Sequence, residues 1–159
     1  MAGEPVADPD AAAEPTYRNP ALTVDGVVLL REPQVAGADN LSVLLIERGR
    51  EPFQGCHALP GGFVDYGEDV DAAIAREVAE ETGLTGVTWR QFHTFGQPGR
   101  DPRGHTVSVV YVGVLTGPAP AVTGGDDAAA AAWFPVTELP KLAFDHAHIL
   151  ERVLAAEKS

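Results

Sequence analysis

The chain has 159 residues, of which 45% are hydrophobic and 21% charged, and its formal net charge is −12. This length predicts one domain with a core large enough to fold by itself. The excess of acidic residues argues against a nucleic acid or a membrane as partner, because anionic surfaces bind basic proteins. A phosphate-bearing small molecule stays open as a ligand, because a divalent cation can reverse the sign of a local site.

The first residues, "MAGEPVADPDAAAEPT", predict a disordered acidic tail over 1–16, since they offer little apolar surface to bury. They lack the basic and apolar regions of a signal peptide, and no apolar run approaches the ~20 residues of a membrane span. The single cysteine, Cys56, excludes an intrachain disulfide and fits a reducing compartment. We expect a cytoplasmic protein with one domain over 17–159, and a homodimer is one candidate state.

Runs rich in leucine and β-branched residues predict strands at 21–30 and 41–48, joined by a loop that contains Pro, Gly, Asp and Asn. A glycine-rich turn region, "LPGGFVDYGE", comes next, and a helix is predicted from about Asp69 to Thr82. Asp69 suits the N-cap, and Gly83 suits the position just after the helix.

Two more strands are predicted at 87–95 and 105–115, separated by the loop "GQPGRDPRG". A second loop leads to a short strand around 131–134, and a helix from about 144 to 157 closes the chain. Strands that outnumber the helices spaced between them predict an α/β layered domain with a mixed sheet.

The helix at 69–82 gathers negative charge, because Glu77, Glu80 and Glu81 share an arc of about 100°. Like charges at these spacings repel each other, so a cation is expected to compensate them. Carboxylate oxygens suit Mg²⁺ or Mn²⁺. A solvated acidic face is the alternative reading, but the preceding glycine turn favours a ligand, since glycine lets it approach the backbone.

These residues resemble the Nudix box. Gly62, five residues, Glu68, seven residues and then "REVAEETGL" match every fixed position of that motif. The resemblance implies an α/β/α sandwich around a mixed sheet, with the box forming a loop–helix–loop. It also implies hydrolysis of a nucleoside diphosphate linked to another group.

The resemblance further implies roles for the charged residues of the box. Glu77, Glu80 and Glu81 would be the metal-binding carboxylates for Mg²⁺, with Mn²⁺ as an alternative. Glu68 would be a further acidic group of the site, and Arg76 would orient the glutamates through ion pairs.

Sequences outside the box resemble the ADP-ribose pyrophosphatase branch of this family, in "EPFQGCHALPGGFVDYGE", "FGQPGRDPRGHTVSVVYVGVL" and "LAFDHAHIL". This resemblance implies cleavage of ADP-ribose to AMP and ribose 5-phosphate. Two alternatives stay open. One is another Nudix substrate, such as an oxidised nucleoside triphosphate, NADH or a dinucleoside polyphosphate. The other is a non-catalytic sensor that binds ADP-ribose.

Candidate substrate-binding residues lie mostly outside the box. Arg100 and Arg103 in the Gly/Pro loop are candidates to grip phosphate with guanidinium forks, and solvated loop arginines are the alternative. Asp127, next to Asp126, is a candidate general base or fourth acidic ligand, with a plain turn before a strand as the alternative. The predicted substrate site also includes Arg48, Gly61 and Gly62.

Three histidines near these motifs are treated separately. His57 stands where the family often has tryptophan, so an aromatic packing contact there is expected to be weaker or replaced. His146 and His148 are two positions apart and do not face each other on a helix. We therefore expect them to cap or pack rather than to share a metal.

Overall fold

The structure is a computed structural model, and it describes residues 17–33 and 39–157. The predicted tail at 1–16 lies outside these residues. None of the helices in the described ranges is both long and apolar enough to cross a membrane.

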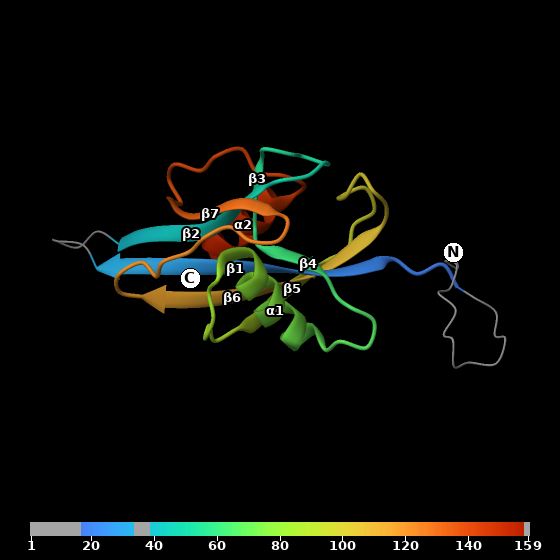
Figure 1. Ribbon diagram of the computed structural model, residues 1–159, viewed down its shortest axis with the longest axis horizontal. Coiled ribbons are helices and arrows are strands. Elements are labelled where there is room, and N and C mark those ends of the chain that lie inside the picture. The colour runs from blue at the N-terminus through green and yellow to red at the C-terminus, as the bar shows by residue number, and fades with distance from the viewer. Residues whose placement is uncertain (1–16, 34–38, 158–159) are drawn as a thin grey trace.

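Seven strands form one sheet in which β3, β2, β1, β6 and β5 follow one another (Figure 1). β4 pairs with β1, and β7 pairs with β2. β1 and β6 are parallel and the other pairs are antiparallel, so the sheet is mixed, as predicted. The bounds are β1 Ala21–Pro33, β2 Asp39–Arg48, β3 His57–Ala58, β4 Gly61–Phe63, β5 Arg90–Phe95, β6 Thr106–Thr116 and β7 Ala128–Pro135.

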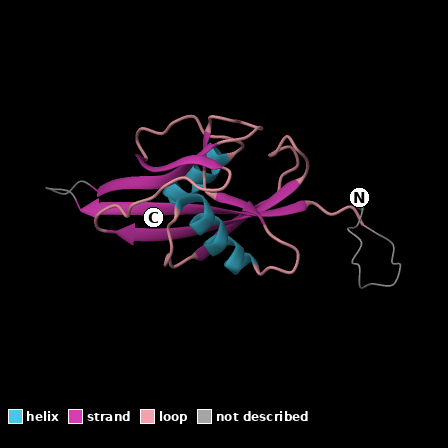
Figure 2. Ribbon diagram, viewed as in Figure 1, coloured by secondary structure: helices cyan, strands magenta, loops and turns pink. Residues whose placement is uncertain are grey.

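One helix packs on each face of the sheet, with α1 (Val70–Thr82) in front and α2 (His146–Glu157) behind (Figure 2). Alternate residues of a strand point to opposite faces. Val27 accordingly packs in the cluster that includes Ile149 of α2, whereas Val28 packs with Ile74 of α1. These two cores produce the predicted α/β/α sandwich.

Both ends of α1 are stabilised as the sequence predicts. The Asp69 side chain accepts a hydrogen bond from the backbone N–H of Asp71 at 3.2 Å, so Asp69 is the N-cap. Gly83 ends the helix with a left-handed φ of 77°, and its N–H donates to the carbonyl of Ala79. This conformation costs little for glycine. The cap thus fixes the start of the helix that carries the box glutamates.

The prediction from sequence missed β3 and β4, because they are too short to show an alternation of apolar and polar residues. Long neighbours place them: β3 pairs with β2, and β4 pairs with Thr23–Asp25 of β1. The last helix begins at His146 rather than at 144, because Phe144 has a φ of 54° and cannot continue a helix. β5 begins at Arg90 instead of 87, and β7 is longer than expected.

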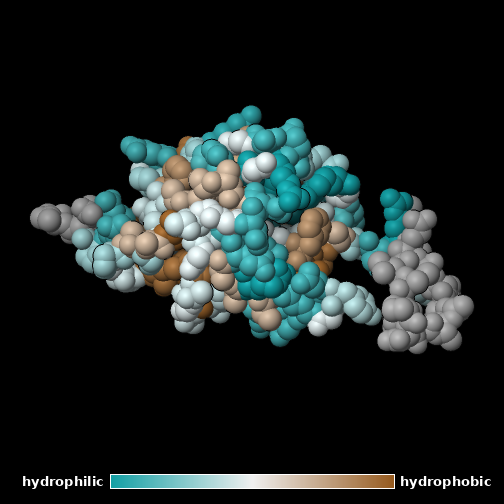
Figure 3. Space-filling view, viewed as in Figure 1, coloured by the Kyte–Doolittle hydropathy of each residue, from teal (hydrophilic) through white to brown (hydrophobic). Residues whose placement is uncertain are grey.

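The surface on the α1 side is mostly hydrophilic, and apolar side chains show only in patches beside it (Figure 3). Large exposed apolar side chains include Phe63 and Tyr66, which lie in and just after β4. Both lie within the box, between Gly62 and Glu68, in the turn that leads to α1.

Candidate active site

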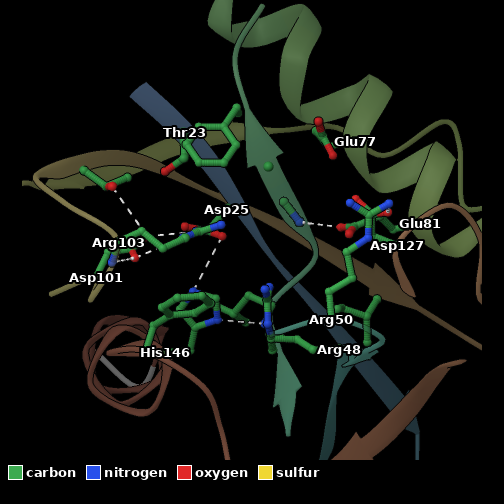
Figure 4. A pocket seen from close by; sticks show the side chains of 18 of the residues that line it. Thr23, Asp25, Arg48, Arg50, Glu77, Glu81, Asp101, Arg103, Asp127 and His146 are labelled. Carbon is green, nitrogen blue, oxygen red and sulfur yellow. Dashed lines mark hydrogen bonds and ion pairs between the residues drawn. The ribbon is translucent and has the colours of Figure 1, made fainter. Parts of the chain in front are cut away.

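A pocket of about 460 Å³ brings together side chains from distant parts of the chain (Figure 4). β1 and β2 form part of its wall, α1 contributes glutamates, and the loop at 96–104 contributes arginines. Its titratable lining residues include Asp25, Arg48, Arg50, Glu77, Glu81, Arg100, Asp101, Arg103, Asp127 and His146. Most of the residues predicted for the site therefore share one pocket.

Arg76 links the acidic residues of the box. Its Nε and Nη2 donate to the two oxygens of Glu68 at 2.7 and 2.9 Å. Its Nη1 donates to Glu77 at 2.9 Å and to Glu80 at 3.2 Å. Hydrogen bonds from this guanidinium hold the pKa of Glu68 down at about 2 and raise the pKa of Arg76 above its ordinary value. One arginine thus sets the positions of Glu68, Glu77 and Glu80.

Glu81 is held by the backbone of β4 rather than by an arginine. Gly61 N–H donates to its Oε1 at 2.8 Å, and the residue is only 8% exposed. Burial, together with the nearby carboxylates, raises the pKa of Glu81 to about 8 against the lowering effect of the Gly61 hydrogen bond. Burial is also the main reason that the pKa of Glu77 is raised. A cation in the pocket would stabilise the ionised form of both groups.

The glutamate oxygens are suitable ligands for a hard divalent cation. In the described residues, however, the three box glutamates do not all point to one place. Glu77 and Glu81 line the pocket, whereas the Oε2 of Glu80 is engaged by Arg76. Among the described residues, no three acidic, histidine or cysteine side chains stand together as a metal-holding group. Glu80 would have to turn away from Arg76 to join the other two. Carboxylates are ligands that Mg²⁺ and Mn²⁺ prefer.

Gly62 lets the Glu77 carboxylate lie against the backbone. A Cβ added at Gly62 would stand 2.5 Å from Glu77 Oε2. At Gly61 the close neighbour is backbone instead, since an added Cβ would stand 2.1 Å from the Val24 carbonyl oxygen. A side chain is therefore excluded at both positions. Gly62 lies against the Glu77 carboxylate, and Gly61 lies against the backbone of β1.

Arg100 and Arg103 are each engaged by a carboxylate, which the sequence did not predict. Arg100 donates through Nε and Nη2 to Asp145 at 2.9 and 2.7 Å, and its side chain is 6% exposed. Arg103 donates in the same way to Asp101 at 3.1 and 2.8 Å. Each fork is thus paired within the protein, and both arginines line the pocket. Their contact with a substrate phosphate stays a prediction.

Arg48 differs from Arg100 and Arg103 because it is not paired with a carboxylate of the described residues. Its Nε donates to the carbonyl of Pro52 at 2.7 Å, and its guanidinium lies over the ring of Phe144. Among the described residues, no carboxylate is within ion-pair distance of Arg48. Burial is the main cause that lowers its pKa. Its terminal nitrogens are accordingly available to an anionic ligand.

Asp127 lies at the rim of the pocket, just before β7. Its carboxylate is 2.5 Å from Arg50 Nη2, and both side chains are more than half exposed. It would have to leave Arg50 to act on a substrate, so its role as general base stays a prediction.

Sequence reasoning missed Asp25 and assigned His146 to capping or packing. His146 is buried, its Nδ1 accepts a hydrogen bond from the Leu59 N–H at 3.0 Å, and burial lowers its pKa. Asp25 accepts from Ser108 Oγ at 2.5 Å. The available signal was a single aspartate within the apolar run "LTVDGVV".

His148 packs, as expected, whereas the aromatic contact of His57 was expected to be weaker or replaced. His57 is half-buried and meets Phe134 edge-on with 5.0 Å between ring centroids, so an aromatic contact persists where the family often has tryptophan. His148 meets the ring of Phe95 at 6.1 Å.

A mixed sheet between two helices, with a glycine turn leading to a glutamate-bearing helix beside a pocket, defines the class of Nudix-fold pyrophosphohydrolases. The family comparison agrees, since the NUDIX domain model matches residues 22–153. The chain belongs to the Nudix family, and the predicted family, fold and enzyme class are confirmed.

Several relatives carry names that mention ADP-ribose. The ADP-ribose pyrophosphatase of Methanocaldococcus jannaschii is 45% identical over 135 residues, which cover 85% of this chain and 73% of that protein. The ADPR-responsive transcriptional repressor NtrR of Acinetobacter baylyi is 35% identical over 101 residues, 62% of this chain and 38% of the repressor. The chain thus spans well under half of that repressor.

Solved structures show the same likeness. The NUDIX domain of Shewanella oneidensis NrtR, in complex with ADP-ribose, has a TM-score of 0.79 and 30% identity, covering 94% of this chain and 93% of that one. A bifunctional NMN adenylyltransferase/ADP-ribose pyrophosphatase from Francisella tularensis, complexed with AMP and a manganese ion, has a TM-score of 0.74 and 27% identity. The match covers 88% of this chain and 42% of that one.

Proposed function

We propose that this protein hydrolyses the pyrophosphate bond of ADP-ribose, releasing AMP and ribose 5-phosphate, with Mg²⁺ or Mn²⁺ as the cofactor. The observation that carries the proposal is one pocket with two kinds of charge. Half-buried Glu77 and buried Glu81 offer oxygen ligands, and Arg48 offers a guanidinium that makes no ion pair with a described residue. A metal-bound pyrophosphate needs both. The resemblance to an ADP-ribose pyrophosphatase at 45% identity supports this substrate.

Glu77, Glu80 and Glu81 are the residues that would hold the cation. When bound, it neutralises the pyrophosphate and makes a coordinated water more acidic. Arg76 orients Glu77 through the hydrogen bond of its Nη1, and the Gly61 N–H orients Glu81. Glu80 would leave its hydrogen bond with Arg76 to reach the cation.

The remaining charged groups would bind the substrate, activate the attacking water or hold the pocket in shape. Arg48 would bind a phosphate oxygen with its terminal nitrogens, because charge-assisted hydrogen bonds to phosphate are strong and directional. Asp127 is proposed as the general base that removes a proton from the attacking water, after it separates from Arg50. Arg100 and Arg103 would hold the pocket wall in shape through their carboxylate pairs.

A small nucleotide is the proposed partner, and the cytoplasm is the proposed location, which the unpaired Cys56 supports. A homodimer also stays a prediction.

A substrate panel tests the proposal against both alternatives. ADP-ribose, NADH, a dinucleoside polyphosphate and an oxidised nucleoside triphosphate would be incubated with the protein and Mg²⁺, and the products separated by chromatography. We expect the highest kcat/KM on ADP-ribose. A higher value on another compound would reassign the substrate, and tight ADP-ribose binding without turnover would indicate the sensor.

A further inference from the structure

A buried carboxylate that the reaction does not use forms part of the pocket wall. Asp25 is 7% exposed, lies in the middle of β1 and lines the pocket (Figure 4). Ser108 Oγ donates to its Oδ2 at 2.5 Å. His146 Nε2 is 3.6 Å from its Oδ1, which is longer than a hydrogen bond. Among the described residues, Oδ1 therefore has no hydrogen-bond donor and is open to a ligand.

Packing holds this oxygen in a fixed position. A Cβ added at Gly61 would stand 2.6 Å from Asp25 Oδ1, so the backbone of β4 lies directly against it. His146 Nδ1 already accepts the Leu59 N–H, which leaves its ring proton on Nε2, facing Asp25. Ser108 also presents a donor. Both neighbours suit an ionised carboxylate that accepts hydrogen bonds.

The arginines at this end of the pocket do not neutralise Asp25. Arg100 is paired with Asp145, and Arg103 is paired with Asp101. Arg48 contacts Pro52 and Phe144, and it makes no ion pair with Asp25. A substrate group placed beside Asp25 therefore meets a local negative charge and an open acceptor.

We propose that Asp25 is a specificity-determining residue that accepts a hydrogen bond from a hydroxyl of the substrate's distal sugar and repels a phosphate at the same place. The proposal rests on the proposed function, because it concerns the group attached to the ADP moiety. A carboxylate has only acceptors, so it matches a hydroxyl donor and opposes an anion. Selection by repulsion of the wrong ligand is a common source of specificity.

ADP-ribose and ATP form a matched pair for the test, since both contain ADP and differ in whether a ribose or a third phosphate follows the β-phosphate. We would measure kcat/KM for both at saturating Mg²⁺ in the parent and in Asp25→Asn, which keeps the shape and removes the charge. The ratio of ATP to ADP-ribose should rise by about tenfold, the size of one charge-assisted contact. Because both substrates need the metal, a weaker metal site would lower both values and leave the ratio unchanged.

Two controls separate the charge of Asp25 from other effects. Glu138→Gln removes one exposed charge outside the pocket and should leave the ratio unchanged. Ser108→Ala removes the hydrogen bond to Asp25 but keeps its charge, so it should shift the ratio by less than about threefold. An Asp25→Asn ratio equal to that of the parent would overturn the proposal while leaving ADP-ribose hydrolysis standing.

Failure of the parent to cleave ADP-ribose at all would instead overturn the proposed function. If Asp25→Asn does not fold, the parent alone can be tested on ADP-ribose that carries an extra phosphate on its terminal sugar. The proposal predicts a kcat/KM at least about tenfold lower for that compound than for ADP-ribose. Equal values would overturn it.

Discussion

Arg76 shows how much one side chain can organise at the residue scale. Its planar fork donates to Glu68, Glu77 and Glu80, and also to the Phe63 carbonyl at 3.2 Å. A lysine ammonium keeps the charge but cannot reproduce this set of directions.

We therefore expect Arg76→Lys to lower kcat by about tenfold or more, because the glutamates lose their common anchor. Arg90→Lys is the matched control, since Arg90 pairs with Glu157 and neither residue lines the pocket. Steady-state kinetics on ADP-ribose would compare the two. Full activity in Arg76→Lys would show that charge alone suffices at this position.

Glu81 gives a prediction about pH. Its folded pKa of about 8 lies above the ordinary value of 4.5, so between these values the folded protein keeps a proton that the unfolded chain releases. The free energy of unfolding of the metal-free protein should then fall as pH rises, by at most about 1.4 kcal/mol per pH unit from this group. The contribution is fully present below 4.5 and lost above 8.

Glu81→Gln should remove that part of the slope, because an amide does not titrate in this range. Urea denaturation at pH 5.5 and pH 8, with a chelator present, would measure the free energy of unfolding of both proteins. The difference in stability between Glu81→Gln and the parent should grow toward pH 8. A constant difference would contradict the raised pKa.

Residues of the site differ in how far the sequence predicts them. The glutamates at 77, 80 and 81 could be predicted as site residues from their helical spacing and from the glycine turn before them. Asp25 and His146 are 3.6 Å apart in space but have no motif that connects them in sequence. The pairing of Arg100 with Asp145 is equally invisible, because it depends on how a loop packs against the start of α2.

At the scale of elements, the turn that contains β4 joins the sheet to α1, the helix that carries the box glutamates. Gly61 and Gly62 are adjacent, but the space beside each has a different neighbour. At Gly61 it is the backbone of β1, which cannot move aside. At Gly62 it is the Glu77 carboxylate, which can.

Alanine at these two positions should therefore have different effects. Gly61→Ala should destabilise the fold by about 1–3 kcal/mol, as overpacking does. Gly62→Ala should cost less stability but weaken Mn²⁺ binding, because it displaces Glu77. Thermal melts and metal titration by calorimetry would separate the two effects. Equal stability losses with unchanged metal affinity would contradict this account of the turn.

Long elements with their own pattern could be predicted, and short ones could not. α1 has a capping aspartate, an apolar stripe and a terminal glycine, so its ends agree with the structure. β3 and β4 have two and three residues, and their pairing with β2 and β1 defines them. Pairing of this kind arises from the tertiary fold, which local sequence does not encode.

At the scale of the whole molecule, the sheet brings distant segments to one pocket. Parallel pairing of β1 and β6 sets Asp25 beside the strand that carries Ser108, and β4 lays its glycines between β1 and α1. Arg48 arrives at the end of β2, and the loop after β5 supplies the opposite wall. The layered fold is therefore what turns a short acidic helix into a binding site with both signs of charge.

The most direct test of the central claim is ADP-ribose cleavage by the parent and by Glu81→Gln at saturating Mg²⁺, with AMP and ribose 5-phosphate separated and quantified. The parent should release both products in equal amounts, and chelation of the metal should stop the reaction. Glu81→Gln should lower kcat by at least about a hundredfold, because a neutral amide is a poor ligand for a hard cation. Equal turnover by the two proteins, or no cleavage by the parent with Mg²⁺ or Mn²⁺, would contradict the account.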